Sequence, residues 1–228
     1  MIPEAADNKI LEDWENKMNK WGEKLLQTAV TAAEMAAIGM GLDKNTFSQK
    51  MIGGAHLLGP TGTDLKRYDV GTTLAGLHYD IALLTVHGKS RFPGLYVWLR
   101  NWKKVAVSVP KGCLLIQAGT TFEHITGGYI LSGYHEVIYT EATKQALLKA
   151  EQEVQNGKDR ILWRVSSTMF SHLSNNTDIS PLKELAHLYN KDTPTKYKKM
   201  TAYEKLMEEL RATSMVSEAK QWWTPYNI

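Results

Sequence analysis

The stretch that decides the fold, residues 76–137, reads GLHYDIALLTVHGKSRFPGLYVWLRNWKKVAVSVPKGCLLIQAGTTFEHITGGYILSGYHEV. Its short apolar segments are separated by Gly and Pro, which is typical of strands joined by tight turns. Successive side chains of a strand point to opposite faces, so residues two apart share a face. His78 and Asp80 are therefore predicted to lie on one face of a strand. His135 lies in a second apolar run near the end of the stretch.

If the fold brings His135 alongside His78 and Asp80, two imidazole nitrogens and one carboxylate oxygen lie on one side of a metal ion. The remaining coordination positions stay open, as in the facial triad of non-haem Fe(II) oxygenases. The spacing by itself does not decide the matter, because a His in an apolar strand is more often a hydrogen-bonded core residue.

The surrounding sequence adds a resemblance. HYDIALLTVHGKS, GLYVW and WKKVAVSVPKGCLLIQAGTTFEHITGGYILSGYHEV resemble the isopenicillin N synthase-like family of Fe(II)- and 2-oxoglutarate-dependent oxygenases. In that family a His-x-Asp strand is followed by a Gly-Leu-x-Val segment, a Trp-containing strand, a Gly-ending strand and a His-Arg-Val strand. The resemblance implies a mainly β fold, with a double-stranded β-helix (jelly roll) core and flanking α-helices. It also implies that His78, Asp80 and His135 bind Fe(II).

A second motif, Arg164-Val165-Ser166, matches the Arg-x-Ser motif of the same family. Arg164 and Ser166 share a face of the last predicted strand. A guanidinium group can hold a carboxylate through two parallel hydrogen bonds, and a neighbouring hydroxyl adds a third. The resemblance implies that these two residues bind the distal carboxylate of 2-oxoglutarate. The other interpretation is a surface Arg that pairs with a Glu.

The sequence departs from the family at three places. Glu136 stands where the family has Arg, and strand alternation predicts that it points away from the metal. Gly59 stands where the family often has a Tyr that contacts the bound carboxylate, so Tyr68 or another residue would have to supply that contact. A helical insertion is predicted at 140–160, with Thr140 as N-cap and Asn156-Gly157 as its end. This helix is either a solvated surface helix or a lid or interface.

We expect one domain over residues 1–228, with N-terminal helices in 1–50, the jelly-roll core in 51–181 and C-terminal helices in 182–228. An apolar stripe predicts an amphipathic helix that ends at Gly39 and Gly41; its members are Leu11, Trp14, Met18, Trp21, Leu25, Ala29, Ala32 and Ala36. Asp43 is predicted to cap a second short helix. Trp222 and Trp223 are expected to pack on the domain or against a second chain.

Strands are predicted at 72–86, 95–99, 104–109, 113–118, 129–131, 135–139 and in a last segment from 161. Four further residues of chemical interest lie in or beside these segments. We expect His56 to be a hydrogen-bonded or exposed residue, His87 to be exposed at a strand end, and Cys113 to be buried. By the resemblance, His124 shapes the pocket without binding the metal.

Composition limits the classes of partner. The chain has 228 residues, of which 43% are hydrophobic, and a formal net charge of +3 with Lys and Arg interleaved with Asp and Glu. A nucleic-acid stripe is therefore not expected. The single Cys fits a reducing compartment, and neither a membrane helix nor a signal segment is predicted. We expect a cytoplasmic protein with a small-molecule substrate. Family members usually carry a further N-terminal region before the first helix, so a homo-oligomer is one way to cover the barrel.

The resemblance implies a dioxygenase that uses O2 and couples decarboxylation of 2-oxoglutarate to oxidation, by default hydroxylation, of the substrate. Two alternatives stay open. The LIQAG and HITGGY segments favour an oxidase of the isopenicillin N synthase type, which uses the same iron site without 2-oxoglutarate. Gly59 and Glu136 motivate a catalytically inactive jelly-roll module that binds a partner.

Overall fold

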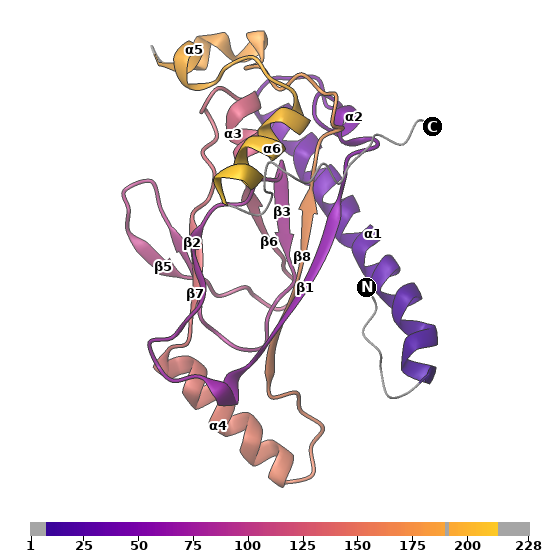
Figure 1. The fold of residues 1–228 in the computed structure, drawn as a ribbon, viewed down its shortest axis with the longest axis vertical. Coiled ribbons are helices and arrows are strands. Elements are labelled where there is room, and N and C mark those ends of the chain that lie inside the picture. The colour runs from indigo at the N-terminus through magenta and orange to yellow at the C-terminus, as the bar shows by residue number, and fades with distance from the viewer. Residues whose placement is uncertain (1–7, 190–191, 214–228) are drawn as a thin grey trace.

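The computed structural model describes residues 8–189 and 192–213, which form two antiparallel sheets that lie face to face with helices around them (Figure 1). Each sheet has four strands. In chain order the strands are β1 (Leu57–Asp64), β2 (Thr73–His78), β3 (Leu84–His87), β4 (Leu95–Trp98), β5 (Lys104–Ala106), β6 (Leu115–Ala118), β7 (His135–Ile138) and β8 (Trp163–Ser171).

The two sheets are interleaved along the chain. Their strand orders are β1-β8-β3-β6 and β2-β7-β4-β5, so the connections pass repeatedly from one sheet to the other. This topology places strands from distant parts of the sequence next to each other. The first strand pairs with the last, with Thr61 opposite Ser166. In the second sheet His78 of β2 lies opposite His135 of β7, so the fold brings the two predicted metal-binding imidazoles together.

Helix α1 (Asn8–Gly39) crosses the outer face of the β1-β8-β3-β6 sheet (Figure 1). Its fully buried residues follow each other at intervals of four, and they are Leu25, Ala29, Ala33 and Ala37. The small side chains let the helix approach the sheet closely, and the Trp21 indole donates to the Ser167 hydroxyl at 2.7 Å. From Trp21 onward the predicted stripe packs on the core, but the predicted Ala32 and Ala36 are only partly buried and the fully buried line runs through Ala33 and Ala37. Trp14, predicted to pack in the core, is instead 40% exposed.

The other helices gather at the two ends of the sheets (Figure 1). Helix α4 lies at one end, and α3, α5 and α6 lie at the other. Their bounds are α2 (Ser48–Met51), α3 (Thr120–Ile125), α4 (Glu141–Gln155), α5 (Thr193–Lys196) and α6 (Ala202–Ala212), with 3-10 helices at Leu65–Arg67 and Lys183–Leu188.

Helix α4 is the predicted insertion. Thr140 accepts from the Thr143 backbone as the N-cap, and Asn156 is the C-cap. The helix is not a fully solvated one, because Leu147 packs in a buried cluster with Leu65, Phe92 and Tyr139. It therefore covers one end of the barrel.

Several predictions of local structure were wrong. The predicted strand 72–86 is interrupted at 79–83, and residues 129–131 form turns and bends because the chain leaves α3 through Gly127 and Gly128, both at positive φ. Cys113 is exposed, since β6 begins only at Leu115. The second predicted helix is confined to Ser48–Met51, and Asp43 accepts from the Asn45 backbone in a turn before it.

Trp222 and Trp223 lie outside the described residues. Among the helices that the structure describes, none is long and apolar enough to cross a membrane.

Candidate metal centre

Asp80 lies just beyond the end of β2, in a segment that the backbone holds firmly. The Asp80 carbonyl accepts from the Thr120 backbone at 2.8 Å, and the Ile81 carbonyl accepts from the Thr121 hydroxyl at 2.7 Å. Residue 119 must be glycine, because a Cβ there would lie 1.9 Å from the Ala82 carbonyl oxygen. The start of α3 thus fixes the place from which the Asp80 carboxyl group points into the barrel.

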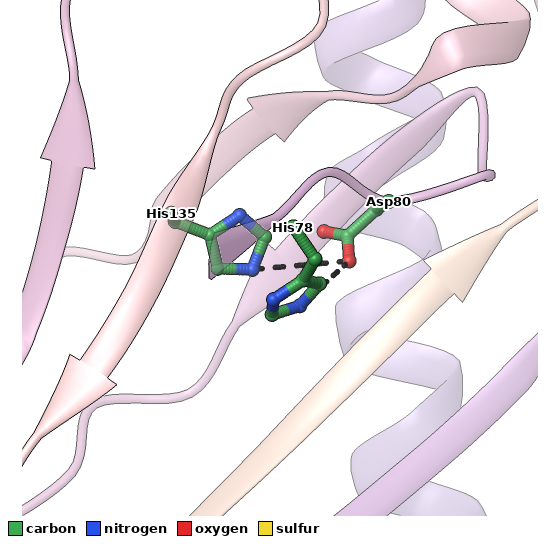
Figure 2. Close-up of side chains that lie close together, drawn as sticks. All are labelled: His78, Asp80 and His135. Carbon is green, nitrogen blue, oxygen red and sulfur yellow. Dashed lines mark ion pairs between the residues drawn. The ribbon is translucent and has the colours of Figure 1, made fainter. Parts of the chain in front are cut away.

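Three predicted ligands meet between the sheets (Figure 2). The Nε2 atoms of His78 and His135 each lie 3.8 Å from Asp80 Oδ1. One ligating atom from each residue lies within 4.8 Å of the other two. Atoms that are each about 2.1 Å from a shared metal ion lie at most about 4.2 Å apart, so the 3.8 Å separations fit ligands of one ion.

Hydrogen bonds orient both imidazole rings. His78 Nδ1 lies 2.7 Å from the Gly76 carbonyl oxygen, and His135 Nδ1 lies 3.2 Å from that of Gly133. A carbonyl oxygen only accepts, so in both rings Nδ1 carries the proton and Nε2 keeps its lone pair. Both Nε2 atoms face Asp80, which is the orientation that metal-binding histidines require.

Burial favours the uncharged form of His135. Burial lowers the pKa of this imidazole below its usual value, the nearby carboxylate of Asp80 opposes that effect, and His78 reinforces it. Asp80 and His135 are buried, whereas the side chain of His78 is 47% exposed. The cluster is therefore open to solvent on the His78 side.

A cavity of about 380 Å³ begins at this cluster, and we call it the metal cavity. Arg164 and Ser166 of β8 also line it, so all five predicted site residues border one space. Burial lowers the pKa of the Arg164 guanidinium, and its Nε is buried without a hydrogen-bond partner among the described residues. Within the same residues no carboxylate lies at ion-pair distance from Arg164. The surface ion pair considered for this residue is thus not what the structure contains.

The metal cavity holds other polar atoms without partners in the described part of the chain. Asp80 Oδ2 and His87 Nε2 are buried there and make no hydrogen bond. Buried polar groups are nearly always satisfied in folded proteins, and a buried carboxylate or guanidinium without a partner is costly. These groups fit a bound cation near Asp80 and a bound anion near Arg164.

The prediction for His87 was wrong. Leu84 and Val86 of β3 pack in the core cluster beneath α1, so alternation turns Thr85 and His87 into the barrel. His87 Nε2 lies 3.9 Å from Asp80 Oδ2. Burial lowers the pKa of His87 to about 4.

Two other predicted imidazoles lie away from the metal cavity. His56 is hydrogen-bonded as expected: Nε2 contacts the Met51 carbonyl oxygen, and Nδ1 accepts from the His172 backbone. His124 is buried, and its Nε2 lies 2.7 Å from the Lys198 carbonyl oxygen. It lines a separate and larger cavity.

The family departures have local explanations. Glu136 forms an ion pair with Lys104 at 2.5 Å and does not line the metal cavity, as alternation predicts. Gly59 lies under Phe170, where a Cβ would approach that ring to 3.2 Å. Tyr68 is exposed and does not line the cavity, so it does not replace the missing Tyr; Thr61 and Ser90 are hydroxyl groups that do line it.

Comparisons with known proteins agree with this geometry at the level of the fold. Comparison of the sequence with protein-family models and with curated proteins finds no match. Three similar solved structures are a 2OG-Fe(II) oxygenase family protein from Caulobacter crescentus, a full-length Neurospora crassa protein in complex with alpha-KG and thymine, and the rice dioxygenase for auxin oxidation.

Their sequence identities to this chain are 20%, 19% and 19%, and the TM-scores are 0.72, 0.68 and 0.64. The matches cover 93%, 88% and 84% of this chain, but only 63%, 57% and 57% of the other chains. This chain thus spans about three fifths of the length of the proteins it matches. It has the fold that these three proteins share.

Proposed function

We propose that this chain is the core of a non-haem Fe(II) dioxygenase that couples decarboxylation of 2-oxoglutarate to oxidation of a small-molecule substrate. One observation carries the proposal. A single cavity is bordered by a His-Asp-His cluster and by the half-buried Arg164, whose buried Nε has no hydrogen-bond partner among the described residues. A metal ion and a dianionic cosubstrate would satisfy both.

His78, Asp80 and His135 are the proposed metal ligands. Imidazole nitrogens with one carboxylate oxygen suit Fe(II), and three ligands on one side leave positions for other molecules. The two rings present Nε2 toward Asp80 because peptide carbonyls hold their Nδ1 protons. The chain therefore has a preformed donor set and needs little rearrangement to bind the ion.

Arg164 and Ser166 are the proposed ligands of the distal 2-oxoglutarate carboxylate. The guanidinium offers paired donors that match a carboxylate, and the hydroxyl group lies on the same face of β8. Lys89 and Arg91 also line the metal cavity, in which Asp80 is the acidic residue. This basic lining favours an anion.

When bound, Fe(II) with O2 and 2-oxoglutarate supplies the oxidation of a C–H bond, by default hydroxylation, with release of succinate and CO2. The residues of the chain bind, orient and shield these molecules. Phe92 and Phe170 line the cavity beside the polar groups and exclude water from the reacting centre. The exposed side of His78 is the proposed approach for the substrate.

The fold supports the same assignment. The strand orders β1-β8-β3-β6 and β2-β7-β4-β5 fit a double-stranded β-helix, or jelly roll. We propose that residues 1–228 form one oxygenase domain, and that a second copy or further chain covers the open side of the barrel.

The test measures O2 uptake and succinate formation. Metal-free protein is loaded with Fe(II) and assayed with and without 2-oxoglutarate, next to Asp80→Ala loaded in the same way. We expect O2 uptake that requires 2-oxoglutarate, yields succinate, and is absent in Asp80→Ala.

Two other results would overturn the proposal. O2 uptake that does not depend on 2-oxoglutarate would indicate an oxidase of the isopenicillin N synthase type. Failure of the wild-type protein to bind Fe(II) or Mn(II) more tightly than Asp80→Ala would indicate a jelly-roll module without a metal.

A further inference from the structure

A third imidazole, that of His87, lines the metal cavity and meets the His135 ring edge-on, with the ring centroids 5.5 Å apart. Its Nε2 faces Asp80 Oδ2 at 3.9 Å, whereas His78 and His135 face Asp80 Oδ1 at 3.8 Å. Both Asp80 Oδ2 and His87 Nε2 are buried, and neither has a hydrogen-bond partner among the described residues. The carboxyl group thus has ligand imidazoles on one oxygen and a separate imidazole on the other.

The surroundings of His87 differ from those of the ligand rings. Gln117 of β6 lies opposite Thr85, which makes it the diagonal neighbour of His87 across the strand pair. Gln117 Oε1 and His87 Nε2 are both buried without a hydrogen-bond partner among the described residues. Unlike the rings of His78 and His135, the His87 ring makes no hydrogen bond to a peptide carbonyl of a described residue.

The tautomer of His87 follows from the group that it faces. A carboxylate oxygen only accepts, so a hydrogen bond between Asp80 Oδ2 and His87 Nε2 requires the ring proton on Nε2. His78 and His135 have the opposite tautomer, with the proton on Nδ1 and a lone pair on Nε2. In this arrangement His87 donates toward Asp80, while the other two rings offer lone pairs to a metal.

We propose that His87 is a positioning residue that holds the Asp80 carboxylate by donating from Nε2 to Oδ2, so that Oδ1 faces the metal. The inference rests on the proposed metal site and deepens it. The 3.9 Å between the two atoms is longer than a hydrogen bond, and a small rotation of either group closes it, or a bridging water spans it.

The consequence is control over how the carboxylate binds. A carboxylate held at one oxygen presents the other to the metal as a single ligand and leaves further coordination positions open. Partners that orient metal ligands in this way are typically worth about 10- to 100-fold in metal affinity.

The test compares Mn(II) binding by titration calorimetry in metal-free wild type, His87→Leu, His87→Gln and Asp80→Ala. Mn(II) serves as a redox-stable substitute for Fe(II). Leu removes the donor and keeps an apolar side chain of similar size, whereas Gln keeps an amide donor. We expect His87→Leu to lose about 10- to 100-fold in affinity and His87→Gln to recover most of that loss.

Two further measurements separate orientation from general damage. Thermal unfolding of each metal-free variant reports whether the fold is kept. Gln117→Leu, which changes the diagonal neighbour of His87 and keeps the imidazole, is expected to weaken Mn(II) binding less than His87→Leu does.

The outcomes distinguish this inference from the proposed function. Equal Mn(II) affinity in wild type and His87→Leu, with loss of binding in Asp80→Ala, would overturn the role of His87 and leave the metal site in place. Equally weak binding by folded His87→Leu and His87→Gln would overturn donation to Oδ2, because the amide would then have restored nothing. Wild-type binding no tighter than that of Asp80→Ala would overturn the metal site itself.

Discussion

Two cavities lie beside the ends of β2 and β7 at which His78 and His135 pair, and they differ in how their charged groups are satisfied. The metal cavity, about 380 Å³, is bordered by His78, Asp80 and His135. The second, about 710 Å³, is bordered by their sequence neighbours Tyr79 and Tyr134. Residues of α3, α5 and α6 line it as well, so we call it the helix-side cavity.

The carboxylates of the helix-side cavity have partners. Glu123 accepts from the backbone and hydroxyl of Ser132, from the Tyr197 hydroxyl and from Lys196. Glu209 pairs with Lys205 at 2.6 Å. The unpartnered atoms found there among the described residues, Trp98 Nε1 and Thr120 Oγ1, belong to uncharged groups.

The metal cavity is the reverse, because the charged side chains of Asp80 and Arg164 each have a buried atom, Oδ2 and Nε, that no described residue contacts by a hydrogen bond. Size alone would select the helix-side cavity, which is nearly twice as large. Unsatisfied buried charge selects the metal cavity instead.

The largest expected effect comes from Asp80→Asn. In the metal-free protein the imidazole nitrogens nearest to the Asp80 carboxylate lie 3.8–3.9 Å away, beyond hydrogen-bond distance. We therefore expect replacement of this buried charge by an amide to raise the free energy of unfolding of the metal-free protein by about 1–3 kcal/mol. The same change should weaken Mn(II) binding by more than about 100-fold, since a ligand is worth more than the partners that orient it. Urea unfolding and titration calorimetry measure the two effects.

Glu209→Gln is the matched control in the helix-side cavity. Its carboxylate is paired with Lys205, so the variant should lose about 1 kcal/mol of stability and keep its Mn(II) affinity. If both variants changed stability in the same direction, the contrast between the cavities would be wrong.

Arg164→Met is expected to weaken 2-oxoglutarate binding and leave Mn(II) binding intact. Loss of a buried, hydrogen-bonded charge typically costs about 2–5 kcal/mol of binding free energy, or roughly 30- to several thousand-fold in Kd. Titration of the Mn(II)-loaded protein with 2-oxoglutarate measures it. Arg100→Met is the control, because Arg100 lines the helix-side cavity and donates to the Tyr129 carbonyl. A comparable loss of 2-oxoglutarate affinity in Arg100→Met would instead place the cosubstrate in the helix-side cavity.

The sequence was informative where a local rule applied. Strand alternation predicted that Glu136 points away from the metal cavity, and the Thr140 cap predicted the start of α4. His78 and Asp80 meet as predicted, although β2 ends at His78 and Asp80 lies in the segment after it. The roles of the five predicted site residues stay predictions until metal and cosubstrate binding are measured.

Non-local contacts could not be predicted in the same way. His87 was expected to be exposed because Gly88 follows it. The apolar Leu84 and Val86 already indicated that His87 points to the other face of the strand. Whether the second sheet covers that face depends on long-range strand pairing, which the local sequence does not show. Likewise, the sequence does not show that Gly119 lies against the Ala82 carbonyl. This close contact lets the start of α3 hold the segment that carries Asp80.

Glu123→Gln tests the structural role of the helix-side cavity through pH. Burial raises the pKa of this carboxyl group, but hydrogen bonds from Ser132, Tyr197 and Lys196 outweigh it and leave the pKa lowered. A lowered carboxyl pKa means that the stabilisation is present above the unfolded value of 4.5 and is lost as the pH falls through the folded value.

We therefore expect Glu123→Gln to be less stable than wild type by about 1–3 kcal/mol near neutral pH. The difference should shrink as the pH falls below 4.5. Urea unfolding at a series of pH values measures it. A difference that did not change with pH would mean that the charge of Glu123 is not what stabilises this region.

The smallest expected effect is that of Tyr79→Phe, which probes whether the two cavities communicate. Tyr79 lies between His78 and Asp80 in the chain, but its side chain faces the helix-side cavity. There its hydroxyl donates to Glu209 at a long 3.4 Å, and its ring meets that of Tyr134 edge-on. Removing one weak hydrogen bond and keeping the ring should change stability by less than about 0.5 kcal/mol.

Mn(II) affinity should stay unchanged, because the backbone of Asp80 is held by Thr120 rather than by the Tyr79 side chain. A measurable loss of Mn(II) affinity would instead show that the ring of Tyr79 helps to set the orientation of the two ligands beside it, and that the cavities are coupled through β2.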